Sequence, residues 1–145
     1  MRIVVGSDHA GFDLKGRIRN VLEADGHDVT DAGCDSADSC DYPDYAHAAA
    51  AEVSAGRAER AVLVCGSGIG MSMAANRHRG VRAAVVADAR SARLARRHND
   101  ANVLCLGARI VDADQAIEIL RAFMETSYEG GRHDRRVAKI EPERG

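Results

Sequence analysis

The chain has 145 residues and a formal net charge of −2 at pH 7, with 20 Lys and Arg against 22 Asp and Glu. This length predicts one domain, residues 1–145, and the charge balance excludes nucleic-acid binding through bulk positive charge. No apolar run approaches the roughly 20 residues that span a bilayer, so we expect no membrane segment. Because its 4 cysteines form no C-x-x-C pair and Met1 leads directly into a strand pattern, we expect a cytoplasmic, reduced protein.

Short apolar runs alternate with helical patterns along the chain. The predicted strands are residues 3–5, 27–31, 61–64, 81–87 and 103–106. The predicted helices are residues 12–25, 45–55, 71–76, 91–98 and a last one that is opened by Asp112 or Asp114. Residues 34–44 are polar and contain Pro43, which indicates a surface loop carrying Cys34 and Cys40. Five strand–helix units predict an α/β protein with a five-stranded parallel sheet and helices on both of its faces.

The central stretch, residues 61–70, reads AVLVCGSGIG. Its apolar half predicts a buried strand, and the glycine-rich loop that follows leads into a helix. Glycine permits φ > 0 and lets a ligand approach the backbone amides, while a helix N-terminus favours negative charge. Cys65 lies at the carboxyl end of the strand, where a thiolate is favoured and where α/β sheets bind ligands. The stretch therefore predicts an anion site with Cys65 as a base or nucleophile.

Two other interpretations of this loop stay open. A dinucleotide-binding loop would place Asp88 at a suitable distance for a ribose-binding acid. Its glycines, however, follow G-x-G-x-G rather than G-x-G-x-x-G, and the loop follows the third predicted strand rather than the first. The second interpretation is a tight turn with a buried, unreactive Cys65.

Two pairs of polar residues are further candidates. Asp8 and His9 follow the first strand and share the carboxyl edge of the sheet with Cys65, although Asp before a helix is more commonly an N-cap. His98 and Asn99 end a predicted helix, where the helix dipole by itself favours a histidine. Both pairs are therefore functional candidates with a structural alternative.

The C-terminal tail, residues 128–145, is charged, and we expect it to be helical in part. Arg132 and Arg136 are four residues apart, so one helix face can present both to a phosphate, although a charged run is usually a solvated face. The histidines and cysteines show no metal-ligand spacing, so we expect no metal site.

Five blocks of the sequence together resemble the ribose-5-phosphate isomerase B family, which includes allose- and galactose-6-phosphate isomerases. The blocks are GSDHAGFDLK (6–15), DYPDYA (41–46), VCGSGIGMSMAANRHRGVRA (64–83), RRHNDANVLCLGAR (96–109) and YEGGRHDRRV (128–137). The resemblance implies a Rossmann-like, three-layer α/β/α domain that interconverts a phosphorylated aldose and ketose without metal or organic cofactor. It also implies a homodimer, or a tetramer, whose active sites are shared between subunits.

The resemblance assigns the catalytic roles. Cys65 matches the base that moves a proton between C1 and C2 of ribose 5-phosphate. His98 matches the acid that opens the furanose ring, reaching in from the partner subunit. Ser67 and the amides of residues 66–70 match the anion hole of the cis-enediolate intermediate. Met71 stands where some members have a glutamate and cannot titrate, which leaves Cys65 as the base.

The remaining matched residues contact the substrate. Asp8 and Asn99 match contacts to sugar hydroxyls, and Tyr42 lies in a block that lines the pocket. The residues that match the family's phosphate ligands are His9, Arg109, Arg132 and Arg136. The residues that match its substrate-binding loop, beside Ser67, are Gly66, Gly68, Ile69 and Gly70. Two other functions stay open: isomerisation of a six-carbon sugar phosphate, and non-catalytic binding of a sugar phosphate or nucleotide.

Overall fold

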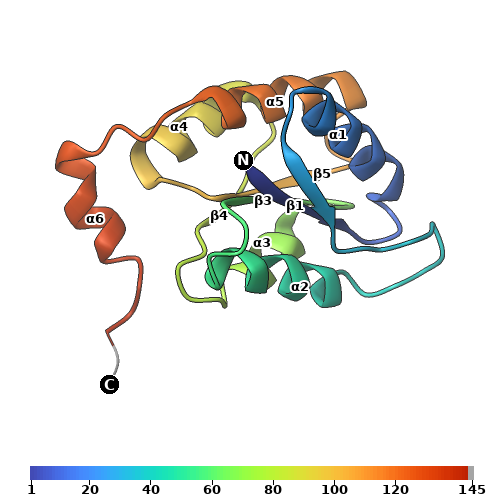
Figure 1. The fold of residues 1–145 in the computed structure, drawn as a ribbon, viewed down its shortest axis with the longest axis horizontal. Coiled ribbons are helices and arrows are strands. Elements are labelled where there is room, and N and C mark those ends of the chain that lie inside the picture. Colours follow the sequence, from blue (N-terminus) through green and yellow to red (C-terminus); the bar gives the residue numbers. More distant parts are fainter. Residues whose placement is uncertain (144–145) are drawn as a thin grey trace.

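Five strands form one sheet in the order β2-β1-β3-β5-β4 in the computed structural model, which describes residues 1–143 (Figure 1). The strands are β1 Arg2–Ser7, β2 Asp28–Asp31, β3 Arg60–Cys65, β4 Ala83–Val85 and β5 Val103–Gly107. Every neighbouring pair is parallel, and β3 lies between β1 and β5. The predicted five-stranded parallel sheet is confirmed.

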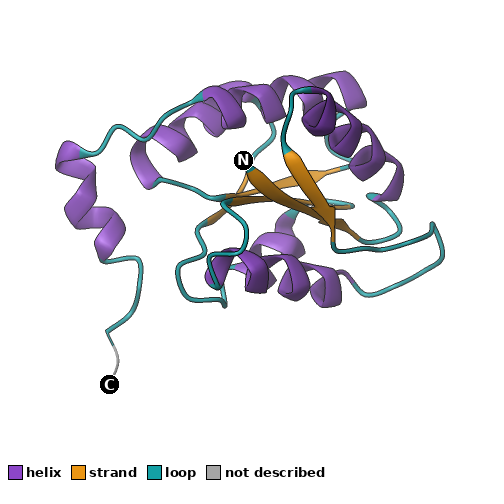
Figure 2. Ribbon diagram, viewed as in Figure 1, coloured by secondary structure: helices purple, strands orange, loops and turns teal. Residues whose placement is uncertain are grey.

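Helices cover both faces of this sheet (Figure 2). They are α1 Phe12–Ala24, α2 Tyr42–Ser54, α3 Ile69–Ala75, α4 Ala89–Asn99, α5 Ala113–Glu125, the 3-10 turn η1 Gly131–His133 and α6 Asp134–Ala138. Helices α1, α4 and α5 share one apolar cluster with the sheet, and α2 and α3 share the other. The predicted three-layer α/β/α arrangement is therefore confirmed.

The central strand supplies both halves of the core. Val62 and Val64 point toward α1, α4 and α5, whereas Leu63 and Cys65 point toward α2 and α3. Side chains alternate between the faces of a strand, so a strand that is covered on both sides is apolar throughout. The same alternation places the Cys65 thiol on the face that carries α3.

Several element boundaries differ from the prediction. Helix α2 begins at Tyr42 rather than at residue 45, because Pro43 in the first helical turn lacks only an N–H that would have no partner there. Helix α4 begins at Ala89, since the Asp88 carboxylate caps it by accepting a bond from Ser91 N at 2.6 Å. The Asp88 carboxylate, which a dinucleotide-binding site would use to bind a ribose, is therefore engaged in capping α4.

The prediction that Cys34 lies on the surface is wrong. Only 4% of the residue is exposed. Its backbone N–H donates to Ser7 O at 2.9 Å, and Ser7 N donates to Gly33 O at 2.8 Å, so this end of the loop lies against the end of β1. Cys40, later in the loop, is half-buried.

The tail is helical in part, as predicted, in η1 and α6. It projects from the body of the domain beyond the end of α4 (Figure 1). Of the predicted tail, residues 144–145 lie outside the described residues. Within residues 1–143, no helix has both the length and the hydropathy that crossing a bilayer requires.

The two ends of the parallel strands matter for the site. We call the side where the strands begin the amino edge of the sheet and the side where they end the carboxyl edge. Parallel strands end at one edge, and each helix returns the chain to the other. Helix α4 accordingly ends at Asn99, shortly before β5 begins at Val103, at the amino edge. Cys65 ends the six-residue β3 at the carboxyl edge. At about 3.3 Å per residue, the two edges lie roughly 20 Å apart.

Candidate active site

A cleft of about 600 Å³ opens at the carboxyl edge of the sheet. Its lining residues are Asp8, Tyr42, Cys65, Gly66, Ser67, Ile69, Gly70, Met73, Arg109 and Ile110. They come from the ends of β1, β3 and β5 and from the starts of α2 and α3. The structure thus brings together the predicted base, the glycine-rich loop, one predicted sugar contact and one predicted phosphate ligand.

The Cys65 thiol accepts a hydrogen bond inside this loop. Gly68 N donates to Cys65 Sγ at 3.1 Å. Gly68 adopts φ +79°, and a Cβ at this position would lie 2.9 Å from the carbonyl carbon of Leu106. Glycine adopts positive φ without strain and has no Cβ to meet Leu106. Another residue at position 68 would therefore disturb the loop that directs this N–H at the sulfur. The loop therefore holds one backbone donor against the sulfur.

Cys105 provides a contrast in the same layer of the core. It lies in β5 and is fully buried. Burial, with the nearby Cys65, raises the pKa of the Cys105 thiol far above its ordinary range. Cys105 is therefore an unreactive core residue, whereas Cys65 borders the cleft.

The glycine-rich loop packs directly against two side chains of the cleft. A Cβ on Gly66 would lie 3.1 Å from Arg109 Nη1, and one on Gly70 would lie 2.5 Å from the Tyr42 ring. The Ser67 hydroxyl accepts a bond from Ile69 N at 3.3 Å and is exposed in the cleft. A hydroxyl, a guanidinium and backbone amides therefore surround the space beside the thiol.

Asp8 closes the turn before α1 and also lines the cleft. It is not the N-cap of α1, a position that Gly11 occupies, but its Oδ1 accepts a bond from Gly11 N at 3.1 Å and closes the turn before the helix. The residue nevertheless lines the cleft. His9 is turned away, toward the loop over residues 34–41, where Cys40 N donates to its Nδ1 at 3.2 Å.

Gly11 holds this turn against the central strand, which leads to a stability prediction. A Cβ on Gly11 would lie 2.5 Å from the carbonyl oxygen of Val64, a backbone atom that cannot move aside. We expect Gly11→Ala to destabilise the protein by about 1–3 kcal/mol. The matched change Gly16→Ala, in open space on α1, should stabilise it by about 0.5–1 kcal/mol. Urea unfolding midpoints measure both, and an unchanged midpoint for Gly11→Ala would contradict the packing argument.

The other predicted site residues form a second group at the amino edge. His98 and Asn99 end α4, and the chain after α5 returns to meet them, with Glu129 N donating to Arg97 O at 3.1 Å. Arg132 and Arg136 follow in the tail, where Arg136 Nη1 donates to Arg132 O at 3.3 Å. Since the two edges lie roughly 20 Å apart, these residues do not reach Cys65 of their own chain.

His133 belongs to this second group, and the sequence pattern did not assign it a role. Its ring stacks on that of His98, with centroids 4.5 Å apart and 15° between planes. The Glu129 carboxylate lies 4.0 Å from His98 Nε2 and 3.9 Å from His133 Nε2. The only signal in the sequence was the position of His133 between arginines.

Potential metal-ligating atoms of His98, Glu129 and His133 all lie within 4.8 Å of one another. The two rings are stacked, with 15° between their planes. Arg132 Nε also donates to His133 Nε2 at 3.4 Å, which places a positive charge where a metal ion would sit. One of the three possible ligand atoms is thus already hydrogen-bonded to a guanidinium.

The fold and the cleft define an α/β protein with a hydrogen-bonded thiol beside a glycine-rich loop. The sequence profile of the ribose/galactose isomerase family matches residues 3–140, and the chain belongs to this family. Ribose-5-phosphate isomerase B of Escherichia coli is 44% identical over 139 residues, which cover 96% of this chain and 93% of the relative. The resemblance seen in the sequence blocks is confirmed, and with it the expectation of an isomerase.

Solved structures agree. Ribose-5-phosphate isomerase B of Clostridium thermocellum has a TM-score of 0.95 and 44% identity, covering 97% of this chain and 95% of its own. The enzyme of Mycoplasma genitalium, with ribulose-5-phosphate bound, has a TM-score of 0.93 and 41% identity, covering 96% and 93%. The cleft and the second group therefore belong to a fold that these isomerases share along nearly its whole length.

Proposed function

We propose that this protein interconverts ribose 5-phosphate and ribulose 5-phosphate through a cis-enediolate. The observation that carries the proposal is the Cys65 thiol, which accepts an amide hydrogen bond and borders a cleft of hydrogen-bond donors. The names of the E. coli and M. genitalium relatives support the substrate. Initial rates of ketose formation from ribose 5-phosphate, compared with those from allose 6-phosphate, test it. Turnover of the hexose alone would move the proposal to a six-carbon substrate.

In this mechanism the Cys65 thiolate takes the proton from C2 of the open-chain aldose and returns it to C1. The negative charge that develops on the enediolate oxygen is held by the Ser67 hydroxyl and free loop amides, which are in place before the reaction. Gly68 N–H and Ile69 N–H are not among them, because the first is bonded to the base and the second to Ser67 Oγ. Asp8 contacts the sugar hydroxyls, and Arg109 lies above Gly66 as a nearby positive charge.

Other groups come from a second copy of the chain. Ring opening needs an acid, proposed here as His98 of the second copy, where Asn99 also meets a sugar hydroxyl. The phosphate needs cations, proposed as Arg132 and Arg136 of the second copy together with His9 and Arg109 of the chain that supplies Cys65. Three apolar side chains at the rim of the cleft are 50% to 65% exposed: Ile69, Met73 and Ile110. In the dimer that we propose, a twofold interface buries this rim, and the second group of one copy lies over the cleft of the other. The tail, with its arginines, then acts on the partner's substrate.

We place this reaction in the cytoplasm. The four cysteines are all unpaired thiols in the structure, and the proposed base must itself remain reduced to act. A reducing compartment satisfies that requirement.

The oxyanion role of Ser67 makes a quantitative prediction. Removing one donor to a developing oxyanion lowers kcat by about 10²- to 10³-fold, and we expect this loss for Ser67→Ala. Ser67→Thr keeps the hydroxyl and should keep most of the rate. Steady-state kinetics of the two variants provide the comparison, and a Ser67→Ala protein as active as Ser67→Thr would remove the hydroxyl from the mechanism.

A further inference from the structure

Asp100 directly follows the two proposed site residues at the end of α4. It adopts φ +47° and ψ 43° and is the only non-glycine residue with positive φ within residues 1–143. Aspartate tolerates this left-handed conformation better than most residues, but it remains unfavourable unless the surroundings enforce it. The backbone thus turns sharply one residue after Asn99, and this conformation requires stabilising contacts from neighbouring residues.

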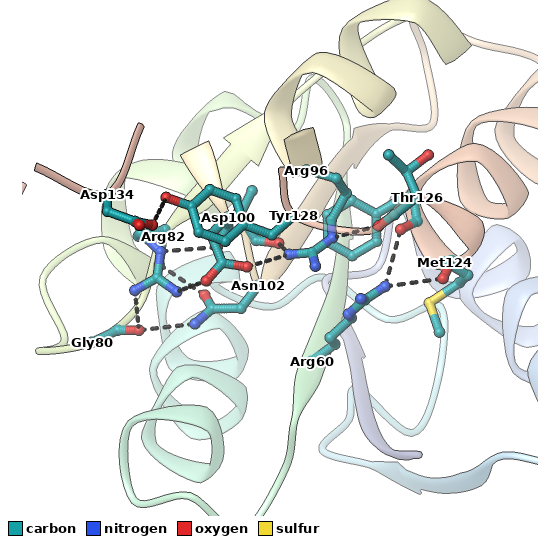
Figure 3. A network of polar contacts seen from close by, with 12 residues as sticks. Arg60, Gly80, Arg82, Arg96, Asp100, Asn102, Met124, Thr126, Tyr128 and Asp134 are labelled. Carbon is teal, nitrogen blue, oxygen red and sulfur yellow. Dashed lines mark hydrogen bonds and ion pairs between the residues drawn. The ribbon is translucent and has the colours of Figure 1, made fainter. Parts of the chain in front are cut away.

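Two arginines hold the Asp100 carboxylate, one on each oxygen (Figure 3). Arg96 Nη1 lies 2.9 Å from Oδ1, and Arg82 Nη2 lies 3.2 Å from Oδ2. Arg82 Nε also donates to the Asp100 carbonyl at 2.8 Å. Arg96 is only 6% exposed, so removal of this carboxylate would leave a buried guanidinium without its ion-pair partner. The left-handed turn is therefore fixed by charge at its side chain and by a hydrogen bond at its backbone.

The same arginine connects the helix end to the beginning of the tail. Arg96 Nε donates to Thr126 O at 3.2 Å, and Arg96 Nη1 donates to Ala101 O at 2.6 Å. Nearby, Arg60 donates to Met124 O at 3.2 Å, and burial followed by repulsion from Arg96 lowers the pKa of Arg60 to about 10 (Figure 3). The Asp100 carboxylate pairs with Arg82 and Arg96 and partly offsets the positive charge of Arg60.

The tail is fastened a second time, a few residues later. Tyr128 donates its hydroxyl proton to Asp134 Oδ1 at 2.7 Å (Figure 3). Burial and this carboxylate raise the pKa of Tyr128 to about 12, so the hydroxyl stays a donor. Glu129, whose carboxylate faces the stacked His98 and His133 rings, lies in the chain between Tyr128 and Asp134, the two partners of this bond.

We propose that Asp100 is a positioning residue for ring opening: its carboxylate, held by Arg82 and Arg96, fixes the left-handed turn that presents the His98 imidazole to the substrate. The inference rests on the proposed function, in which His98 is the ring-opening acid. In this role Asp100 acts through the position of His98. Its loss leaves the Cys65 cleft of the same chain unaltered, because that cleft lies at the other edge of the sheet.

The two chemical steps can be measured separately. Ribose 5-phosphate closes to a furanose, whereas ribulose 5-phosphate stays open, because the oxygen that would close its five-membered ring carries the phosphate. Cys65-dependent exchange of the C1 proton of ribulose 5-phosphate with deuterium in the solvent therefore reports proton transfer without ring opening. Net isomerisation of ribose 5-phosphate needs both steps. A displaced His98 should slow net isomerisation of ribose 5-phosphate and leave the C1 exchange of ribulose 5-phosphate unchanged.

The test compares Asp100→Asn and Asp100→Gly with wild type, by isomerisation rate, C1 exchange and thermal unfolding. Asp100→Asn keeps the shape of the side chain and tolerates the left-handed turn, but it removes the negative charge. Asp100→Gly removes the whole side chain but adopts the turn without strain. Since a misplaced catalytic group commonly costs about 10- to 100-fold, we expect kcat to fall by that factor in both variants, with C1 exchange within about twofold of wild type. Asp25→Asn is the matched control, because Asp25 is also a helix C-cap paired with an arginine, at 3.1 Å, and should leave all rates unchanged.

Three outcomes would overturn the inference. They are isomerisation within about twofold of wild type, an equal loss of isomerisation and exchange, and failure of both variants to fold, since the last two make Asp100 merely structural. Wild-type protein without isomerase activity would instead refute the proposed function itself. The two failures are therefore distinguishable.

Discussion

Cys65→Ala protein is expected to lose ribose 5-phosphate isomerisation almost completely, with kcat lower by about 10²- to 10⁴-fold, the range that a positioned general base contributes. The thiol at the end of β3 accepts a hydrogen bond from the Gly68 amide and borders the cleft. Cys65→Ser should be similarly inactive, because a serine hydroxyl is not ionised near neutral pH. Ketose formation under substrate saturation measures both variants.

The matched control is Cys105→Ala. Cys105 is a buried thiol in the neighbouring strand and on the same face of the sheet, but it does not line the cleft. Its removal should lower stability slightly and leave kcat at the wild-type level. A Cys65→Ala enzyme that keeps most of its activity, with Cys105→Ala equally active, would refute the assignment of the base.

Mixed dimers of two inactive variants are expected to recover activity. In a dimer of one Cys65→Ala chain and one His98→Ala chain, one site combines an intact Cys65 with an intact His98, and the other site lacks both. Random pairing makes half of the dimers mixed, so about a quarter of the wild-type activity should return. The reason is the roughly 20 Å between the two edges of the sheet, which keeps these residues apart within one chain.

The experiment is a 1:1 mixture of the two variants, unfolded in urea and refolded together. Each variant refolded alone, and wild type taken through the same cycle, are the controls. Activity of the mixture equal to the mean of the two separate variants would show that each site is built within one chain. It would leave the role of Cys65 intact and remove the shared site.

Local pattern in the sequence predicted the elements and one half of the site. Runs such as residues 61–64 indicate buried strands, because a strand covered on both faces must be apolar throughout. Gly66, Gly68 and Gly70 mark a loop where backbone and ligand approach closely, and the structure shows that a side chain at each would meet another group. The boundary errors at α2 and α4 arose where Pro43 and Asp88 act within a single helical turn.

Long-range packing decided the rest. The strand order 2-1-3-5-4, the burial of Cys34 and the placement of His98 at the edge opposite Cys65 depend on which segments meet in space. The stacking of His98 on His133 and the pairing of Asp100 with Arg82 and Arg96 join residues whose spacing carries no periodic signal. Sequence by itself determined the local conformations and the chemistry available. Only the tertiary structure decided which groups share a site, because that depends on contacts between residues far apart in the chain.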